Sequence, residues 1–309
     1  MTDSPFPAAA TLVEVGLRDG LQAEATTVPT EVKVELVDAL VAAGLGDLQI
    51  ASFVHPRLVP QMADAEAVCQ AVRDRHPRGS GPVFSGLALN ARGVERAAAA
   101  DLDAVDLSIS TNDAHSQRNA GMGVAAAQAA LAEMVRLARA AGLEVRAGLQ
   151  CVWGAGADGP TDPGHAVRMV QDTLALGVDQ LSLADSTGQA TPLTVARMLA
   201  RVRPLADEAG VPVVLHLHDT RGAGLANVAE ALRLGVVHFD VAFGGMGGCP
   251  FIPGATGNIP TEDTALMLAG MGVETGVDAA AVAAVSRRVE ALLGHAFSGR
   301  AYALLAPAA

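Results

Sequence analysis

The stretch HAVRMVQDTLALGVDQLSL, residues 165–183, contains the pattern that decides the fold. Its first part, His165–Leu176, carries apolar residues at helical spacing and ends at Gly177, and glycine commonly terminates helices. Gln180–Leu183 follows as a short apolar run, which is typical of a strand buried on both faces. The unit is therefore a helix, a glycine and a strand.

The same unit recurs along the chain. The runs predicted as strands are Leu12–Gly16, Leu48–Ser52, Val83–Ala88, Ala104–Ser108, Val145–Cys151, Gln180–Leu183, Val213–His218 and Val237–Phe243. Longer segments rich in Ala, Leu and Val separate them, and these predict helices at Glu31–Ala43, Val124–Ala141, His165–Leu176, Pro192–Ala206 and Gly222–Leu234.

Alternating strands and helices of this number predict an α/β fold, a (β/α)8 TIM barrel. The alternative is an open doubly wound sheet, but no Gly-x-Gly-x-x-Gly follows the first strand as a dinucleotide-binding sheet would require. We expect residues 1–309 to form a single catalytic domain, with a C-terminal helical extension from about residue 261 to residue 309.

Composition and charge narrow the class of function. The 309 residues are 50% hydrophobic, enough for a large core, and the net charge of −12 argues against nucleic acid as a partner. Cys69, Cys151 and Cys249 are widely spaced and odd in number, which does not suit a disulfide framework. Without a signal peptide or an apolar run of membrane-spanning length, we expect a cytoplasmic protein with no membrane partner.

Unusual polar residues follow the predicted strands at their carboxyl ends, the face that carries catalysis in TIM barrels. They include Arg18 and Asp19 after the first strand, Ser52 at the end of the second, the polar stretch Ser110–Asn119 after the fourth, Asp185 after the sixth, and His216 and His218 in the seventh. A purely structural protein has no reason to concentrate polar groups there.

His216 and His218 are two residues apart on a predicted strand, so both side chains should project into the barrel mouth. Two such imidazoles can bind one divalent ion; the alternative is a pair of buried structural histidines. Asp19 offers a carboxylate oxygen and Asn258 an amide oxygen. Nitrogen and oxygen ligands together favour Mg²⁺ or Mn²⁺ over tetrahedral zinc.

Three further residues are candidates for catalysis. The guanidinium of Arg18 suits a carboxylate or an enolate-like oxygen, or an ordinary salt bridge. Asp185 could orient a ligand and assist proton transfer, or cap the next helix. Cys249 lies in a loop with six glycines between Gly244 and Asn258, where an accessible thiol could exchange a proton; a small buried cysteine is the alternative.

Five motifs carry a family resemblance. They are EVGLRDGLQ (14–22), SFVHPRLVPQMAD (52–64), HLHDT (216–220), GGCPF (247–251) and GATGN (254–258). On these motifs the chain resembles the 3-hydroxy-3-methylglutaryl-CoA lyases, a family of metal-dependent TIM-barrel lyases related to Claisen-condensing enzymes. The resemblance runs from about Leu12 to Gly276.

The resemblance implies a reaction, the retro-Claisen cleavage of a 3-hydroxyacyl-CoA thioester to acetyl-CoA and a keto acid. It also implies a homodimer. For the matched residues it implies metal ligation by Asp19, His216, His218 and Asn258, enolate stabilisation by Arg18, proton donation by Cys249, and a proton relay through Asp185.

Substrate contacts are expected from Gln22, Gln49, Ser52, Gly247 and Gly248. Gln49 stands where the family usually has an acidic residue, and the polar stretch Ser110–Asn119 is unusually long, so the 3-alkyl group of the substrate could differ from methyl. Two other readings stay open: another Claisen-type synthase or aldolase of the same superfamily, and a non-catalytic acyl-CoA-binding relative.

Overall fold

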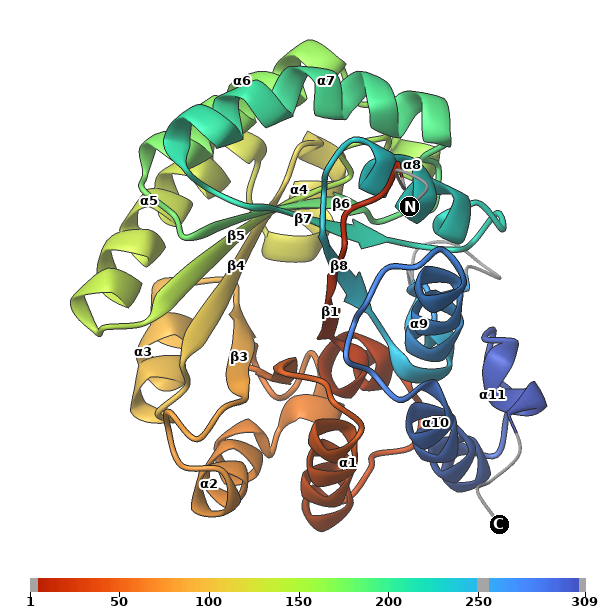
Figure 1. The fold of residues 1–309 in the computed structure, drawn as a ribbon. Coiled ribbons are helices and arrows are strands. Elements are labelled where there is room, and N and C mark those ends of the chain that lie inside the picture. Colours follow the sequence, from red (N-terminus) through yellow and green to blue (C-terminus); the bar gives the residue numbers. More distant parts are fainter. Residues whose placement is uncertain (1–4, 249–255, 306–309) are drawn as a thin grey trace.

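A computed structural model describes residues 5–248 and 256–305 of the chain. Within them, parallel strands close into a barrel in chain order, with β1 paired to both β2 and β8 (Figure 1). The strands are β1 (Thr11–Glu14), β2 (Asp47–Ser52), β3 (Val83–Ala88), β4 (Ala104–Ser110), β5 (Glu144–Gln150), β6 (Gln180–Asp185), β7 (Val213–Leu217) and β8 (His238–Val241). This closed barrel confirms the predicted (β/α)8 fold.

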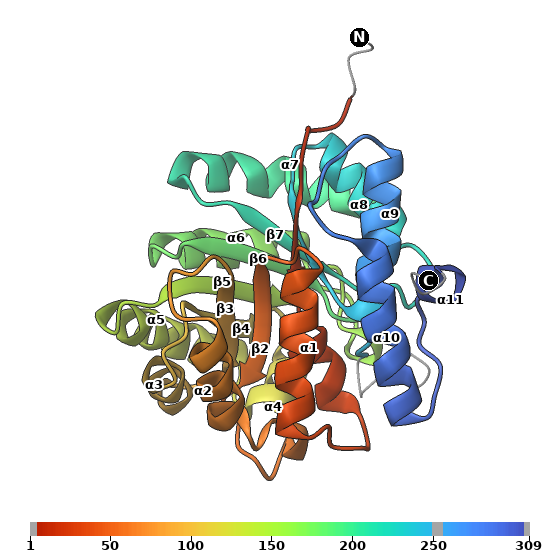
Figure 2. The same ribbon diagram turned by 60° about the horizontal axis from the view of Figure 1, so that its bottom comes forward.

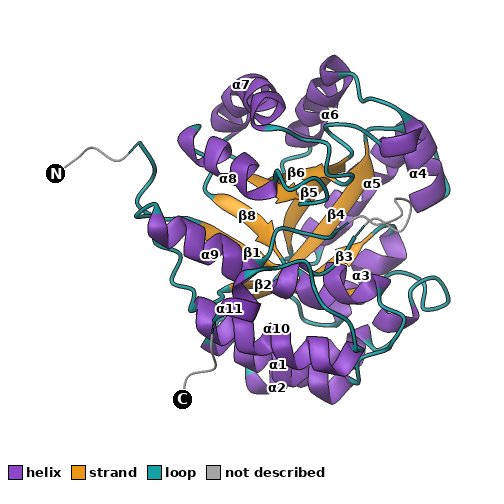
Figure 3. Ribbon diagram, turned by 90° about the vertical axis from the view of Figure 1, so that its right-hand side faces the viewer, coloured by secondary structure: helices purple, strands orange, loops and turns teal. Residues whose placement is uncertain are grey.

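Helices surround the barrel on its outer side, and strands occupy the interior (Figure 3). Between the strands of the chain they are α1 (Thr30–Ala42), α2 (Ala65–Arg75), α3 (Ala91–Ala99), α4 (Asp113–Ala120), α5 (Val124–Ala140), α6 (Pro163–Ala175), α7 (Pro192–Ala209) and α8 (Gly224–Arg233). The chain then continues through α9 (Thr261–Gly270), α10 (Ala279–Leu293) and α11 (Ala301–Leu304). Helix α10 packs beside α1 (Figure 2).

The segment around α6 shows why the helix–glycine–strand unit folds as it does. Asp162 caps the helix by accepting hydrogen bonds from the amides of Gly164 and His165, both at 3.0 Å, and Pro163 occupies the first turn, where its missing N–H costs nothing. Gly177 has φ +72°, a conformation that glycine adopts without strain. This reversal sends the chain directly into β6.

Two local features go beyond what the sequence predicted. Strand β1 ends at Glu14, two residues before the predicted end at Gly16, and Gly16–Gly20 form a π-helical turn. The polar stretch after β4 is helical over Asp113–Ala120, with the Asn112 side chain accepting from the His115 amide at 3.0 Å. Both elements are short and held by polar contacts, so they leave no apolar periodicity to detect.

Apolar side chains of the strands and of the inner helix faces form one continuous core. Phe53, Phe84, Phe239 and Phe243 are among its largest fully buried members. None of the helices in the two described ranges has both the length and the apolar character needed to cross a bilayer.

Candidate active site

A cavity of about 710 Å³ opens where the carboxyl ends of the strands meet. Predicted residues that line it are Arg18, Asp19, Gln22, Gln49, His216, His218 and Gly248. Its volume is in the usual range for small-molecule sites. The barrel therefore gathers residues from the turns after β1, from β2, from the end of β7 and from the loop after β8 around one space.

The π-helical turn after β1 positions Arg18 and Asp19. The carbonyl of Val15 accepts from the amides of both residues, at 3.1 and 2.7 Å, which curls the chain inward at the rim. Arg18 then pairs with the Asp19 carboxylate through Nη1 and donates from Nε to Gln49 Oε1. Gln22 donates to Asp19 Oδ1 at 3.0 Å. These contacts fix the plane of the buried guanidinium.

The two histidines converge on Asp19. The Nε2 atoms of His216 and His218 lie 3.1 Å apart, and His216 Nε2 lies 4.0 Å from Asp19 Oδ2. One ligand atom from each of the three residues falls within 4.8 Å of the others. This arrangement has the composition and spacing of a divalent-cation site.

Asn258 completes the cluster from the far end of the glycine-rich loop. Its side-chain amide donates to Asp19 Oδ2 at 2.8 Å and to the Met246 carbonyl at 3.0 Å. Its buried Oδ1 has no hydrogen-bond partner among the residues that the structure describes. Gly247 makes this close approach feasible, because a Cβ there would lie 2.7 Å from Asn258 Nδ2.

Electrostatics favour the protonation states that a cation requires. Burial opposes ionisation of Asp19, but Arg18, the two histidines and the Asn258 amide together lower its pKa. Burial, helped by His216 and Arg18, lowers the pKa of His218 to about 4. An ionised carboxylate and a neutral imidazole are the forms that ligate metals.

Asp185 and Ser52 are not among the residues that line the cavity. Both carboxylate oxygens of Asp185 accept backbone hydrogen bonds, from Gln189 at 2.8 Å and from Ala190 at 2.9 Å, so the side chain anchors the loop after β6. The Ser52 hydroxyl is fully buried, and no partner for it lies within residues 5–248 or 256–305. Cys249 lies outside the described residues.

Three charged residues of the barrel interior were missed. Asp106, Arg146 and Asp240 are buried, line the floor of the cavity and form ion pairs with one another. A signal existed in the sequence, because each is a charged residue within a predicted strand that is otherwise mainly apolar. In a barrel interior such a residue needs a partner.

Comparison with known proteins places the chain in a family. The family model described as HMGL-like matches residues 9–289. Hydroxymethylglutaryl-CoA lyase of Bos taurus mitochondria is 37% identical over 273 residues, covering 88% of this chain and 82% of that protein. The chain belongs to the HMGL-like family.

Two other HMGL-like proteins bear on the site. A Pseudomonas aeruginosa lyase named for 3-hydroxy-3-isohexenylglutaryl-CoA and hydroxymethylglutaryl-CoA is 36% identical, covering 98% of this chain and 99% of its own. A hydroxymethylglutaryl-CoA lyase of Acinetobacter baumannii, solved with coenzyme A and 3-methylmalate, superposes with a TM-score of 0.89 at 34% identity, covering 97% and 95% of the two chains. These relatives are carbon–carbon lyases, which confirms the predicted resemblance.

Proposed function

We propose that this protein cleaves 3-hydroxy-3-methylglutaryl-CoA, or an analogue with another 3-alkyl group, in a divalent-metal-dependent retro-Claisen reaction. The products are acetyl-CoA and acetoacetate or the corresponding keto acid. The observation that carries the proposal is the convergence of Asp19, His216 and His218 on the wall of the cavity that Arg18 also lines.

The residues present fit a cation of the Mg²⁺ or Mn²⁺ type. The two imidazole Nε2 atoms lie 3.1 Å apart, one ligand atom from each histidine falls within 4.8 Å of an Asp19 oxygen, and such mixed nitrogen and oxygen ligands would suit a hard divalent cation. The unpartnered Asn258 Oδ1 supplies a second oxygen beside Asp19. When bound, the cation would act as a Lewis acid toward the oxygens of the substrate.

Arg18 stabilises the charge that develops during cleavage. The C3 hydroxyl loses its proton, the C2–C3 bond breaks, and its electron pair moves toward the thioester, so that C3 becomes a ketone. Negative charge then builds up on the thioester oxygen. A guanidinium held in advance by Gln49 and Asp19 stabilises that oxygen without reorganisation.

Protons must leave the hydroxyl and reach the enolate carbon to give acetyl-CoA. Following the family resemblance, we assign proton donation to Cys249. A part for Asp185 in the relay stays a prediction, and its two backbone contacts support a role in holding the loop after β6. Gln22, Gln49, Gly247 and Gly248 would contact or border the substrate.

The cavity wall favours substrates with an apolar 3-substituent. Leu58 is 79% exposed yet borders the cavity, together with Val54, Val59, Leu87 and Leu89. An exposed leucine gains by covering an apolar ligand. We therefore include 3-alkyl groups larger than methyl within the proposed substrate class.

The deciding experiment measures acetyl-CoA release from a panel of 3-hydroxy-3-alkylglutaryl-CoA thioesters, with Mg²⁺ or Mn²⁺ and after treatment with EDTA. We expect release that depends on the metal and returns when metal is added back. Metal-loaded protein that binds these thioesters without cleaving any of them would refute the proposal and favour a binding protein. Condensation of an acyl-CoA with a keto acid, with no cleavage, would favour a synthase.

Two finer expectations accompany the proposal. We expect a homodimer, which light scattering on the purified protein would test, and a cytoplasmic location, which cell fractionation would test.

A further inference from the structure

A chain of polar contacts crosses the barrel interior beneath the proposed metal site. Ser85 donates to Asp106 Oδ2 at 2.7 Å, and Arg146 Nε pairs with Asp106 Oδ1. Arg146 Nη1 lies 2.6 Å from Asp240 Oδ1. Asp240 Oδ2 lies 3.1 Å from His216 Nδ1. The chain therefore ends on an imidazole of the metal cluster.

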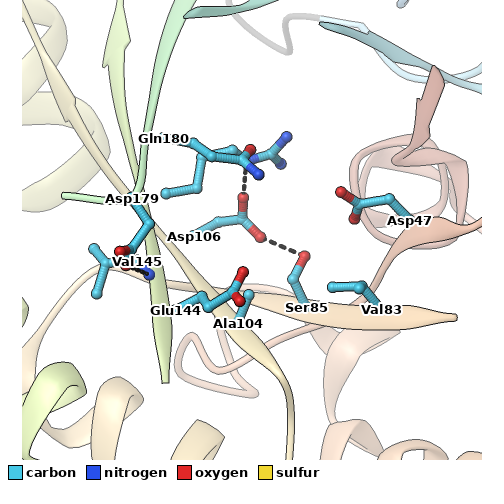
Figure 4. A pocket seen from close by; sticks show the side chains of 10 residues that line it. Asp47, Val83, Ser85, Ala104, Asp106, Glu144, Val145, Asp179 and Gln180 are labelled. Atoms are coloured by element: carbon cyan, nitrogen blue, oxygen red, sulfur yellow. Dashed lines mark hydrogen bonds and ion pairs between the residues drawn. The ribbon is translucent and has the colours of Figure 1, made fainter. Parts of the chain in front are cut away.

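The register of the sheet builds this chain. Asp106 and Arg146 are direct partners on β4 and β5, and His216 and Asp240 are direct partners on β7 and β8. Arg146 connects the two pairs across the barrel. Figure 4 shows the Asp106 carboxylate directed at the Ser85 hydroxyl. All four charged or imidazole side chains thus lie in adjoining layers of one closed sheet.

The two oxygens of Asp240 have different partners. Oδ1 is occupied by Arg146, so Oδ2 is the atom that faces His216. A carboxylate in an ion pair only accepts hydrogen bonds. Nδ1 of His216 must therefore carry a proton, and in the neutral ring, which is the form that binds metals, the lone pair is then on Nε2, the atom that faces His218 and Asp19.

His218 provides an internal comparison. Its Nδ1 is buried, and the described part of the chain offers it no hydrogen-bond partner. Of these two imidazoles, only His216 has its second nitrogen fixed by a carboxylate. Such a contact sets both the tautomer and the ring orientation of a metal-binding histidine.

We propose that Asp240 is a positioning residue, which holds His216 in the tautomer that presents Nε2 to the cation. Arg146 and Asp106 hold Asp240 in turn. This inference rests on the proposed metal site. It assigns Asp106, Arg146 and Asp240 a function beyond stabilising the barrel.

The test is Asp240→Asn, measured by Mn²⁺ titration of metal-free protein and by ¹⁵N NMR of labelled histidine. Arg146 requires an oxygen, so the amide nitrogen of the variant turns toward Nδ1 and the proton moves to Nε2. We expect the Mn²⁺ dissociation constant to rise about 10- to 100-fold. The matched control is Ser85→Ala, which removes a contact at the other end of the same chain and should leave Mn²⁺ affinity within about twofold.

The outcomes separate this inference from the proposed function. If the wild-type protein does not bind Mn²⁺, the metal site itself is wrong. If it binds and a folded Asp240→Asn variant binds equally well, the positioning role is overturned. If the variant does not fold, the ¹⁵N spectrum of the wild-type protein decides, with the His216 signal assigned by its loss in His216→Gln. The proposal requires the proton on Nδ1 of His216. A proton on Nε2 instead overturns it.

Discussion

Glu14 links the end of β1 to the start of α9 and to the segment that precedes the glycine-rich loop. Its Oε1 accepts from the amides of Gly16 at 2.7 Å and Phe243 at 3.1 Å, and its Oε2 lies 2.6 Å from the Thr261 hydroxyl. Burial raises the pKa of this carboxyl to about 8, although all three hydrogen bonds oppose the shift. A neutral acid retains every contact if Oε2–H donates to Thr261.

The substitution Glu14→Gln reproduces that neutral acid at every pH. In the wild type the folded state holds the Glu14 proton more tightly than the unfolded chain does. Proton binding by Glu14 therefore contributes fully to the free energy of unfolding below about pH 4.5, and this contribution is lost as the pH rises through about 8. Each pKa unit corresponds to about 1.4 kcal/mol, so the rise from 4.5 to about 8 amounts to up to about 5 kcal/mol. The variant avoids this loss.

We therefore expect wild type and Glu14→Gln to have similar unfolding free energies at pH 5, and the variant to be more stable by several kcal/mol at pH 9. Urea unfolding followed by circular dichroism at pH 5, 7 and 9 measures the difference. Glu208→Gln, at an exposed position of α7, controls for the loss of a carboxylate as such. A stability difference that is the same at pH 5 and pH 9 would refute the reasoning.

Two predictions concern the proposed chemistry. Cys249→Ala should reduce turnover at least about 100-fold, as expected for a lost general acid, without changing Mn²⁺ affinity; full turnover in the variant would remove Cys249 from the mechanism. Asn258→Ala should weaken Mn²⁺ binding at least about 10-fold, since it removes the unpartnered oxygen beside Asp19; equal affinity, measured by calorimetry on metal-free protein, would show that Asn258 is not a ligand.

The sequence predicted the fold well because its signal is local and repeated. Apolar runs gave the strands to within a few residues, and Val83–Ala88 has the same bounds in the structure. Helix α4 could not be found in this way. It is polar, and side-chain oxygens hold its N-terminal end: Asn112 accepts from the amide of His115, and Asp113 accepts from the amide of Val124 at the start of α5.

The four predicted ligands could also be brought together from sequence. A TIM barrel places the carboxyl ends of all its strands at one rim, and residues two apart on a strand share a face. Asp19, His216, His218 and Asn258 accordingly meet although 239 positions separate Asp19 from Asn258. For Asp185, residue type and position allowed two roles, and only the folded chain shows that both of its oxygens bind backbone amides.

By itself, then, the sequence determined which segments become strands and helices, and which polar residues reach the rim. Only the tertiary structure decided that Arg146 would cross the barrel to Asp240 and that Asp240 would meet His216. The physical reason is that hydrophobic periodicity acts over a few neighbouring residues, whereas a contact between β5 and β8 exists only after the barrel has closed and its register has been set.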